Sequence, residues 1–126
     1  FYRLYFSNEN ISINGIFLQF DLENIKIEQY FNKIKCCFDE TNNNLKTIKN
    51  IIGIEKNILD ICNDINIKPS YRIEEQMSNK YIKIFDQKKL KLGNYKKLSI
   101  LLKISGIWSS NPQKEYGLTF RFFINN

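Results

Sequence analysis

Lysine and aromatic side chains are concentrated in one segment of this sequence, residues 80–103, and together they could do binding chemistry. The segment holds eight lysines and one aspartate, a net charge of +7, whereas the whole chain of 126 residues carries +6. Lysine ammonium groups neutralise phosphates and release counterions, and exposed rings stack on bases. An A+T-rich coding bias would scatter lysines along the chain, so it does not explain their concentration here.

The same segment and the residues after it alternate as half-buried strands do. Apolar residues fall at even positions from Ile82 to Phe122, so we expect that side of each strand to face the core. The odd positions place cations and rings on the opposite face, where lysines would contact phosphates and the rings would stack on bases. These candidate binding residues are Tyr81, Lys83, Phe85, Lys89, Lys91, Tyr95, Lys97, Lys103 and Arg121.

The pattern favours a nucleic-acid-binding protein, with single-stranded DNA as the preferred partner, although it does not separate DNA from RNA. Two other interpretations stay open. Lysine on an outer sheet face protects edge strands against aggregation, and the rings could pack under a helix or a second chain. The alternative function is therefore a structural or virion protein that uses the same face for assembly, including assembly as a homo-oligomer.

Catalytic and metal-binding signatures are missing from the sequence. The chain has no histidine, which removes Ser–His and Cys–His pairs and the usual zinc ligand. Cys36, Cys37 and Cys62 form no Cys-x-x-Cys motif, and the glycines form no phosphate-binding loop. Asp60 and Asp64 are better explained by an exposed helix face than by a shared cation. We therefore expect no enzyme, no cofactor and no metal site.

Trp108, the only tryptophan, follows Gly106 near the end of a long predicted strand. A glycine at such a place favours a bulge or a sharp bend. We expect Trp108 to close one end of the core; its alternative role is a stacking platform. The three cysteines are expected to be reduced and mostly buried, which is typical of an intracellular protein.

The strands and the helix expected to position these residues indicate an α+β fold in a single domain, residues 1–126. Strands are expected at 1–6, 14–22 and 30–38, with a loop at 8–15, and the last two strands are expected to pair as a hairpin, 97–107 with 116–124. One main amphipathic helix is expected at about 45–65, and residues 71–79 form a short helix or an irregular crossing. The antiparallel sheet dominates, and its closure into a barrel stays open. No apolar run approaches the length of a membrane span, so no membrane partner is expected.

The segment LKISGIWSSNPQKEYGLTFRFFIN, residues 102–125, resembles a C-terminal signature of small uncharacterised proteins of large DNA viruses and of related elements integrated in insect or protist genomes. The similarity covers about a third of the chain and none of residues 1–70. It implies a viral setting, where small basic proteins coat DNA or build the virion, and a location in the infected cell's nucleus or cytoplasm or in the virion. Because the chain begins with Phe1, we expect it to be a fragment or a processed product.

Overall fold

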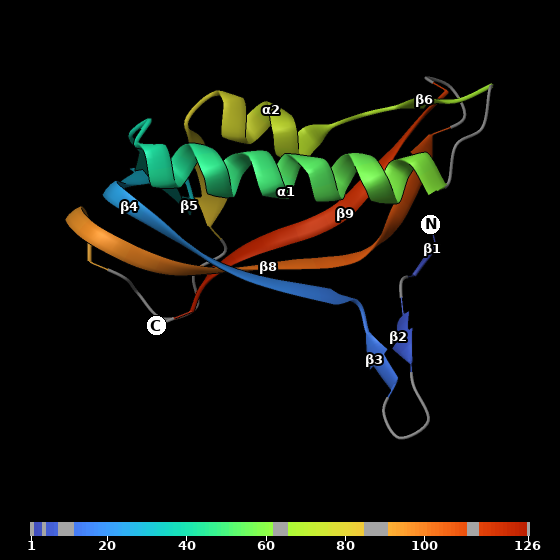
Figure 1. Ribbon diagram of the computed structural model, residues 1–126, viewed down its shortest axis with the longest axis horizontal. Helices are drawn as coiled ribbons and strands as arrows, with labels where there is room; N and C mark the ends of the chain where they lie inside the picture. The colour runs from blue at the N-terminus through green and yellow to red at the C-terminus, as the bar shows by residue number, and fades with distance from the viewer. Residues whose placement is uncertain are drawn as a thin grey trace.

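The computed structural model describes the backbone of residues 2–3, 5–7, 12–61, 66–84, 91–110 and 114–125. Within these ranges it has two helices and nine strands (Figure 1). The helices are α1 (Asn42–Ile61) and α2 (Arg72–Ser78). The strands are β1 (Tyr2–Arg3), β2 (Tyr5–Ser7), β3 (Ser12–Asn14), β4 (Ile16–Tyr30), β5 (Lys33–Phe38), β6 (Lys68–Pro69), β7 (Tyr81–Ile84), β8 (Gly93–Ser110) and β9 (Glu115–Ile124).

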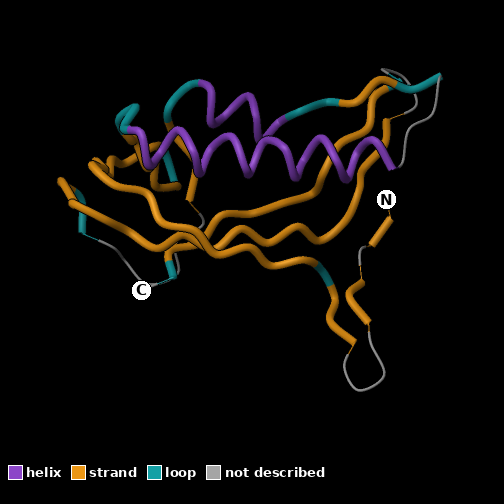
Figure 2. Tube along the Cα trace, viewed as in Figure 1, coloured by secondary structure: helices purple, strands orange, loops and turns teal. Residues whose placement is uncertain are grey.

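Five of these strands close into a ring, in the order β4, β5, β7, β9, β8 and back to β4. Every junction in the ring is antiparallel except the one between β7 and β9, which is parallel and joins Ile84 to Phe122. Helices α1 and α2 lie together on one side of the strands (Figure 2). The predicted α+β fold with a dominant antiparallel sheet is therefore confirmed, and the sheet adopts the barrel-like closure that the sequence left open.

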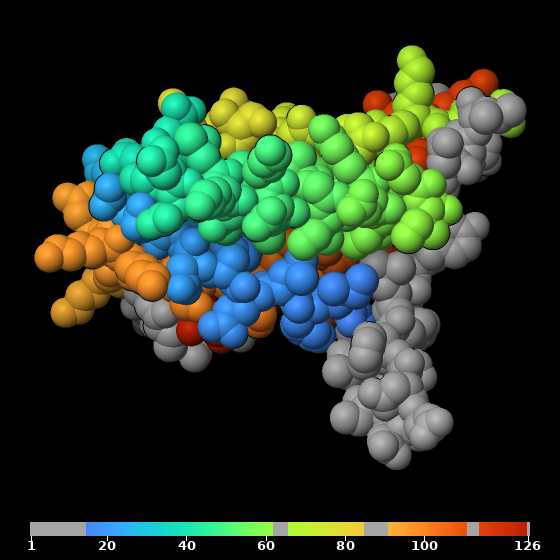
Figure 3. Space-filling model, in the orientation of Figure 1, coloured from blue at the N-terminus to red at the C-terminus, as the bar shows by residue number. Residues whose placement is uncertain are grey.

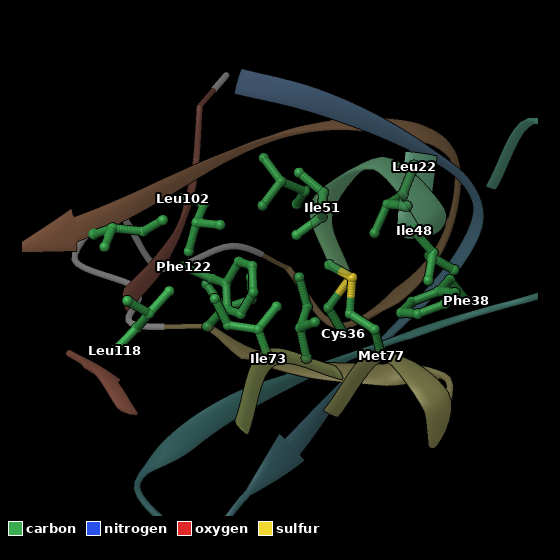
Figure 4. Packing of buried hydrophobic residues seen from close by; sticks show 14 of the residues in the cluster. Leu22, Cys36, Phe38, Ile48, Ile51, Ile73, Met77, Leu102, Leu118 and Phe122 are labelled. Carbon is green, nitrogen blue, oxygen red and sulfur yellow. The ribbon is translucent and has the colours of Figure 1, made fainter. Parts of the chain in front are cut away.

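The core lies between the inward side of the ring and α1. Leu22, Leu102 and Phe122 point inward from three strands, and Ile48 and Ile51 of α1 pack against the same cluster (Figure 4). Each of these side chains is at least 92% buried, and burying one fully stabilises the fold by about 1.5–3 kcal/mol. Viewed from outside, α1 runs along one face of the molecule, over β4 (Figure 3).

The predicted alternation of the C-terminal strands is confirmed along most of their length. Leu98, Ile100, Leu102 and Ile104 are all buried, as the even positions should be. The predicted hairpin is also confirmed, because β8 pairs with β9 from Ile100 opposite Ile124 to Ser110 opposite Glu115.

The alternation fails at the start of β8, where a kink reverses the two faces. The ladder between β4 and β8 skips the position of Asn24, whose φ of 53° is left-handed, and both strands exchange faces there. Leu22 and Leu98 point inward on one side of the kink, and Ile25 and Tyr95 on the other. The prediction that Tyr95 faces outward is therefore wrong, and Leu92, expected in the core, is 56% exposed.

A buried amide fixes this kink. Asn44, in the first turn of α1, is 1% exposed and pairs with the backbone of Glu23 next to Asn24. Its Oδ1 accepts from the Glu23 N–H at 2.9 Å, and its Nδ2 donates to the carbonyl oxygens of Glu23 and Asp39, both at 2.8 Å. The side chain thus supplies the partners that a neighbouring strand would otherwise give.

A second irregularity occurs in β8 between Ile104 and Gly106, as the sequence predicted. The register with β9 shifts there, so Ile107 and Leu118 face the core beyond it. Trp108 therefore lies on the outer side of its strand, opposite Gly117.

Helix α2 is attached to α1 by a buried carboxylate. Glu55 of α1 is fully buried, and its two oxygens accept hydrogen bonds from the backbone N–H groups of Ile73 and Glu74 at 2.9 and 3.0 Å. These groups belong to the first turn of α2, where N–H groups lack partners within the helix. Burial raises the pKa of Glu55 above its ordinary value, and the two hydrogen bonds partly oppose that shift.

The N-terminal elements differ in extent from the sequence prediction. Strand β4 continues to Tyr30, and the chain turns at residues 31–32, because the kink breaks the alternation that would have marked one long strand. Residues 12–14, expected in a loop, pair with β2 as a separate two-stranded sheet.

Helix α1 begins at Asn42, three residues early, and residues 62–65 of the predicted helix lie outside the described ranges. Neither described helix combines the length and the apolar character that crossing a membrane would take.

Candidate nucleic-acid interface

Four cations lie in one row across four neighbouring strands of the ring. Lys103 of β8 is directly opposite Arg121 of β9, and Lys83 of β7 is directly opposite Lys35 of β5. The parallel pair Ile84–Phe122 places Lys83 level with Arg121 and so joins the two halves of the row. We call Lys35, Lys83, Arg121 and Lys103 the cationic belt. With about 4.8 Å between neighbouring strands, the belt spans roughly 14 Å.

The belt lysines belong to none of the described ion pairs, although one carboxylate, Glu28 of β4, lies directly opposite Lys35. The described ion pairs are Lys26–Glu28, Lys56–Glu74, Lys80–Glu40 and Lys97–Asp21, with N–O distances of 3.2 to 3.4 Å. Within the described part of the chain, Lys35, Lys83 and Lys103 belong to none of them. Glu28 forms its described ion pair with Lys26, so these three lysines are left without one.

Aromatic rings are interleaved with these cations. The Lys35 ammonium lies 4.3 Å from the centre of the Tyr81 ring, and the Lys83 ammonium lies 5.1 Å from that of Tyr30. At the other end of the belt, the Lys103 ammonium lies 5.8 Å from the ring of Phe17, a residue that is 47% exposed. Rings beside cations are what single-stranded nucleic acids contact, because bases stack on the rings while phosphates bind the cations.

Phe31 forms an exposed tip beside this surface. It is the first residue of the two-residue turn between β4 and β5, its side chain is 85% exposed, and its ring contacts that of Tyr30 edge-on at 4.9 Å. Its φ of 52° is left-handed, a conformation that favours glycine or asparagine over phenylalanine. Neither core packing nor backbone preference favours a phenylalanine at this position.

A pocket of about 500 Å³ opens beside the belt, at the junction of β7 and β9. Lys83 and Arg121 of the belt line it, and Lys33 of β5 and Arg72 of α2 add two further cations. Gln76 of α2 also lines it, and its Oε1 accepts a hydrogen bond from the Lys83 N–H at 3.1 Å, so α2 holds the backbone edge of β7 there. We call this the seam pocket.

The structure brings together only part of the predicted surface. Tyr81, Lys83, Lys103 and Arg121 meet along the belt, as expected. Lys97 does not join them, because it lies six residues from Lys103, roughly 20 Å along β8, and pairs with Asp21.

Four further predicted residues precede the kink. Tyr95 is half-buried against the core, and its hydroxyl donates to the carbonyl oxygen of Lys91. Lys91 itself is exposed, at the far end of β8 from the belt. Phe85 and Lys89 lie outside the described residues.

Sequence reasoning missed Lys33 and Lys35, along with Tyr30 and Phe31. The signal was present, because the predicted strand 30–38 places Ile34, Cys36 and Phe38 on one side and therefore both lysines on the other. These lysines lie outside the charge-rich segment after residue 80, so charge density did not select them. The closure of the ring brings β5 next to β7, which the local pattern does not reveal.

The adjacent cysteines behave as structural residues. Cys36 is fully buried and Cys37 is half-buried on the opposite side of β5, and both are free thiols. Burial, with a smaller contribution from Cys37, raises the pKa of Cys36 to about 12. Burial and the nearby Glu28 carboxylate raise the pKa of Cys37. Neither thiol is thus poised as a nucleophile. Among the described residues, no group of three or more His, Cys, Asp or Glu side chains could hold a metal ion.

Trp108 takes neither predicted role in full. The Arg72 guanidinium lies 4.3 Å from the centre of its ring, and the ring also packs on Gly117, where an added Cβ would come within 2.9 Å of the indole. Trp108 therefore forms a wall of the seam pocket outside the core, with neighbours on its ring.

Comparisons of this chain with known families, proteins and structures assign no function, so the geometry of the belt and of the seam pocket is the basis for one. The resemblance of residues 102–125 to proteins of large DNA viruses stays a prediction. No model of a known protein family, no curated protein and no solved structure matches this chain.

Proposed function

We propose that this protein binds single-stranded nucleic acid along the cationic belt, as a non-enzymatic binding protein of viral type. The observation that carries the proposal is the row Lys35, Lys83, Arg121 and Lys103, whose three lysines belong to none of the described ion pairs. A strand crossing this row would place its phosphates on the cations and release counterions. Single-stranded DNA is the preferred ligand.

The rings favour single strands over duplexes. Tyr30 and Tyr81 lie among the cations, and Phe31 projects beside them. Bases in a duplex are already stacked on one another, whereas unpaired bases can stack on protein rings, with about 1–3 kcal/mol for each base. A duplex would use the cations alone, so its affinity should be lower and should respond little to loss of a ring.

The architecture offers an analogy in support. OB-folds are five-stranded barrels that bind oligonucleotides on the face of their second and third strands and on nearby loops. In this ring the second and third strands along the chain are β5 and β7, which carry Lys35, Tyr81 and Lys83. A shared architecture does not by itself assign a function, so the proposed function depends on the belt residues.

The test is a fluorescence-anisotropy titration with labelled oligo-dT and a duplex of equal length at several salt concentrations. Four phosphate contacts on a single strand predict that the affinity falls with salt with a log–log slope of about −3. Oligo-dT should bind more tightly than the duplex at each salt concentration. Absence of binding to both ligands at low salt would contradict the proposal.

The structural alternative predicts a different result. If the face serves assembly, the chain should form a defined oligomer whose stability barely changes with salt, and charge reversal at Lys35 and Lys83 should alter that oligomer. The exposed ring of Phe31 is the feature that favours this alternative, since exposed aromatics also anchor protein interfaces. Sedimentation of the wild type and of the double variant separates the two functions.

A further inference from the structure

The seam pocket differs in charge from the other two pockets described. A pocket at the kink mixes Lys26 and Lys96 with Asp39, and a pocket beside α1 mixes lysines with Asp21 and Glu23. Among the described residues, the seam pocket is lined by two lysines and two arginines and by no carboxylate. Its volume of about 500 Å³ falls in the usual range of ligand pockets, about 300–1,000 Å³. Its positive charge suits a small anion. The four cations are Lys33, Arg72, Lys83 and Arg121.

One of these cations is held in a fixed orientation. The guanidinium of Arg72 stacks on Trp108 at 4.3 Å, and the indole in turn packs on the bare backbone of Gly117. A stacked guanidinium keeps its N–H groups in its own plane, where they can bind two phosphate oxygens at once. Trp108 and Gly117 therefore act as positioning residues for Arg72.

An unpaired donor lies at the same site. The Nε1 atom of Trp108 is buried and has no hydrogen-bond partner among the described residues. Buried polar groups are nearly always satisfied, so an acceptor from outside the described residues is expected there. An oxygen atom of a bound anion or of a water molecule beside it would supply that acceptor.

We infer that the seam pocket binds the terminal phosphate of a nucleic-acid strand whose chain continues along the belt. The inference rests on the proposed function and names the part of the ligand that this pocket takes. Lys83 and Arg121 belong to both surfaces, so a strand whose end enters the pocket can continue directly onto the belt.

Charge is the reason for assigning the end of a strand and not an internal phosphate. An internal phosphodiester carries one negative charge, whereas a terminal phosphomonoester carries about −1.5 to −2 at neutral pH and has three strong acceptor oxygens. Four cations lining one pocket match the second of these better. A free nucleotide offers the same monoester, so the experiment must separate the two sources.

The experiment uses the complete chain and two signals. Trp108 is the only tryptophan, so its fluorescence reports occupancy of the seam pocket, while anisotropy of a labelled strand reports total binding. The ligands are oligo-dT with a 5′-phosphate, with a 3′-phosphate or with hydroxyls at both ends, together with free dTMP and inorganic phosphate. We expect one phosphorylated end to bind about tenfold more tightly than the hydroxyl-ended strand and to change the fluorescence of Trp108.

Variants locate the effect in the pocket. Arg72→Gln and Lys33→Gln should each lower the ratio of affinities between phosphorylated and hydroxyl-ended strands towards one. Lys49→Gln, on the exposed face of α1, is the matched control and should keep both the ratio and the basal affinity. Circular dichroism confirms that each variant is folded; Arg72, Lys33 and Lys49 are all exposed, so all three should be.

The outcomes distinguish the two proposals. Equal affinity for phosphorylated and hydroxyl-ended strands overturns the pocket assignment and leaves the belt function standing. Binding of dTMP as tightly as the phosphorylated strand overturns the assignment of a strand end in favour of a free nucleotide. Failure of all the oligonucleotides to bind overturns both proposals.

Discussion

Two sides of the ring carry lysines on their outer surface, but they differ in what surrounds those lysines. On the β4–β8 side, Lys97 pairs with Asp21 and Lys26 pairs with Glu28. On the β5–β7–β9 side, Lys35 and Lys83 belong to none of the described ion pairs and lie beside tyrosine rings, although Glu28 of β4 is directly opposite Lys35. The first arrangement is typical of a solvated sheet face, and the second leaves Lys35 and Lys83 without a described ion pair.

The difference shows that the number of lysines in a segment is a poor guide to function. Lys83, Lys97 and Lys103 come from the same charge-rich stretch of sequence, yet the ring sends Lys97 to the paired side and the other two to the belt. Exposed ion pairs contribute little to stability, typically about 0–1 kcal/mol, so the paired side is best explained by solubility. The belt lysines belong to no described ion pair, so this explanation does not apply to them. The asymmetry between the two groups of lysines can be tested.

The largest expected effect concerns Glu55, which attaches α2 beside the belt side. Glu55→Ala removes the acceptor for two N–H groups of α2, one of them fully buried, and we expect a loss of about 3 kcal/mol in the free energy of unfolding. Urea denaturation measures the change. Asn44→Ala, which loosens the kink on the other side, should cost about 2 kcal/mol. Only Glu55→Ala should also impair the seam pocket; equal effects of both variants on binding would contradict the comparison.

Charge reversal tests the two sides directly. Lys35→Glu combined with Lys83→Glu should weaken binding to oligo-dT by about 100-fold and reduce the salt slope by roughly 1.4, because two phosphate contacts are lost. Lys96→Glu combined with Lys97→Glu makes the same change of net charge on the paired side and should weaken binding less than threefold. Anisotropy titrations measure both variants. Equal losses would mean that overall charge, and not the belt, governs binding.

Phe31 separates binding from stability. Phe31→Asn removes an exposed ring, so we expect affinity for oligo-dT to fall about tenfold, as for the loss of one stacked base. Asparagine tolerates the left-handed turn better than phenylalanine, so the free energy of unfolding should stay the same or rise by up to about 1 kcal/mol. Titration and urea denaturation of the same preparation give both values. A variant with reduced stability and full affinity would assign Phe31 to the fold.

The pH dependence of stability should reflect Glu55. Because burial raises the pKa of this carboxyl in the folded state, the folded chain holds the proton more tightly than the unfolded chain does. The extra stability that comes from this tighter proton binding is therefore fully present below the ordinary carboxyl pKa, about 4.3. It is lost as pH rises through the raised value. Denaturation at a series of pH values should show this decline, and Glu55→Gln should remove it. A decline that persists in the variant must come from other groups.

The smallest effect is expected on the paired side. Lys97→Gln breaks the 3.4 Å ion pair with Asp21, whose partners are 69% and 51% exposed. Pairs of this kind are screened by solvent, so the free energy of unfolding should change by less than about 0.5 kcal/mol. Affinity for oligo-dT should also stay unchanged. A clear loss of either quantity would show that the two sides are less distinct than their ion pairs indicate.

Much of the fold followed from local pattern. The alternation from Leu98 to Ile104, the hairpin of β8 with β9 and the amphipathic character of α1 were all predicted, because period-2 and period-3.6 patterns depend only on neighbouring residues. The pattern failed where the backbone departs from regular geometry, at the kink beside Asn24. Beyond it, Tyr95 turned out to face inward and Leu92 outward.

The candidate site was predicted in part. The sequence selected Tyr81, Lys83, Lys103 and Arg121 because they alternate with apolar residues in one stretch of the chain. It did not select Lys33 and Lys35. These lysines reach the same surface only because β5 pairs with β7, and the two strands are separated in the sequence by both helices. It also wrongly grouped Lys97 with the belt, since distance along a strand and pairing with Asp21 are not visible in the alternation.

By itself, the sequence determined which side of each regular strand is apolar, that α1 has a buried face, and that cations and rings share the opposite side of the C-terminal strands. The tertiary structure decided which of those cations become neighbours, which form an ion pair with a carboxylate, and where Lys83 and Arg121 meet Lys33 and Arg72 around a pocket. The physical reason is range. Side-chain periodicity is set by the backbone over a few residues, whereas the closure between β7 and β9, the kink at Asn24 and the buried contacts of Glu55 join residues far apart in the chain.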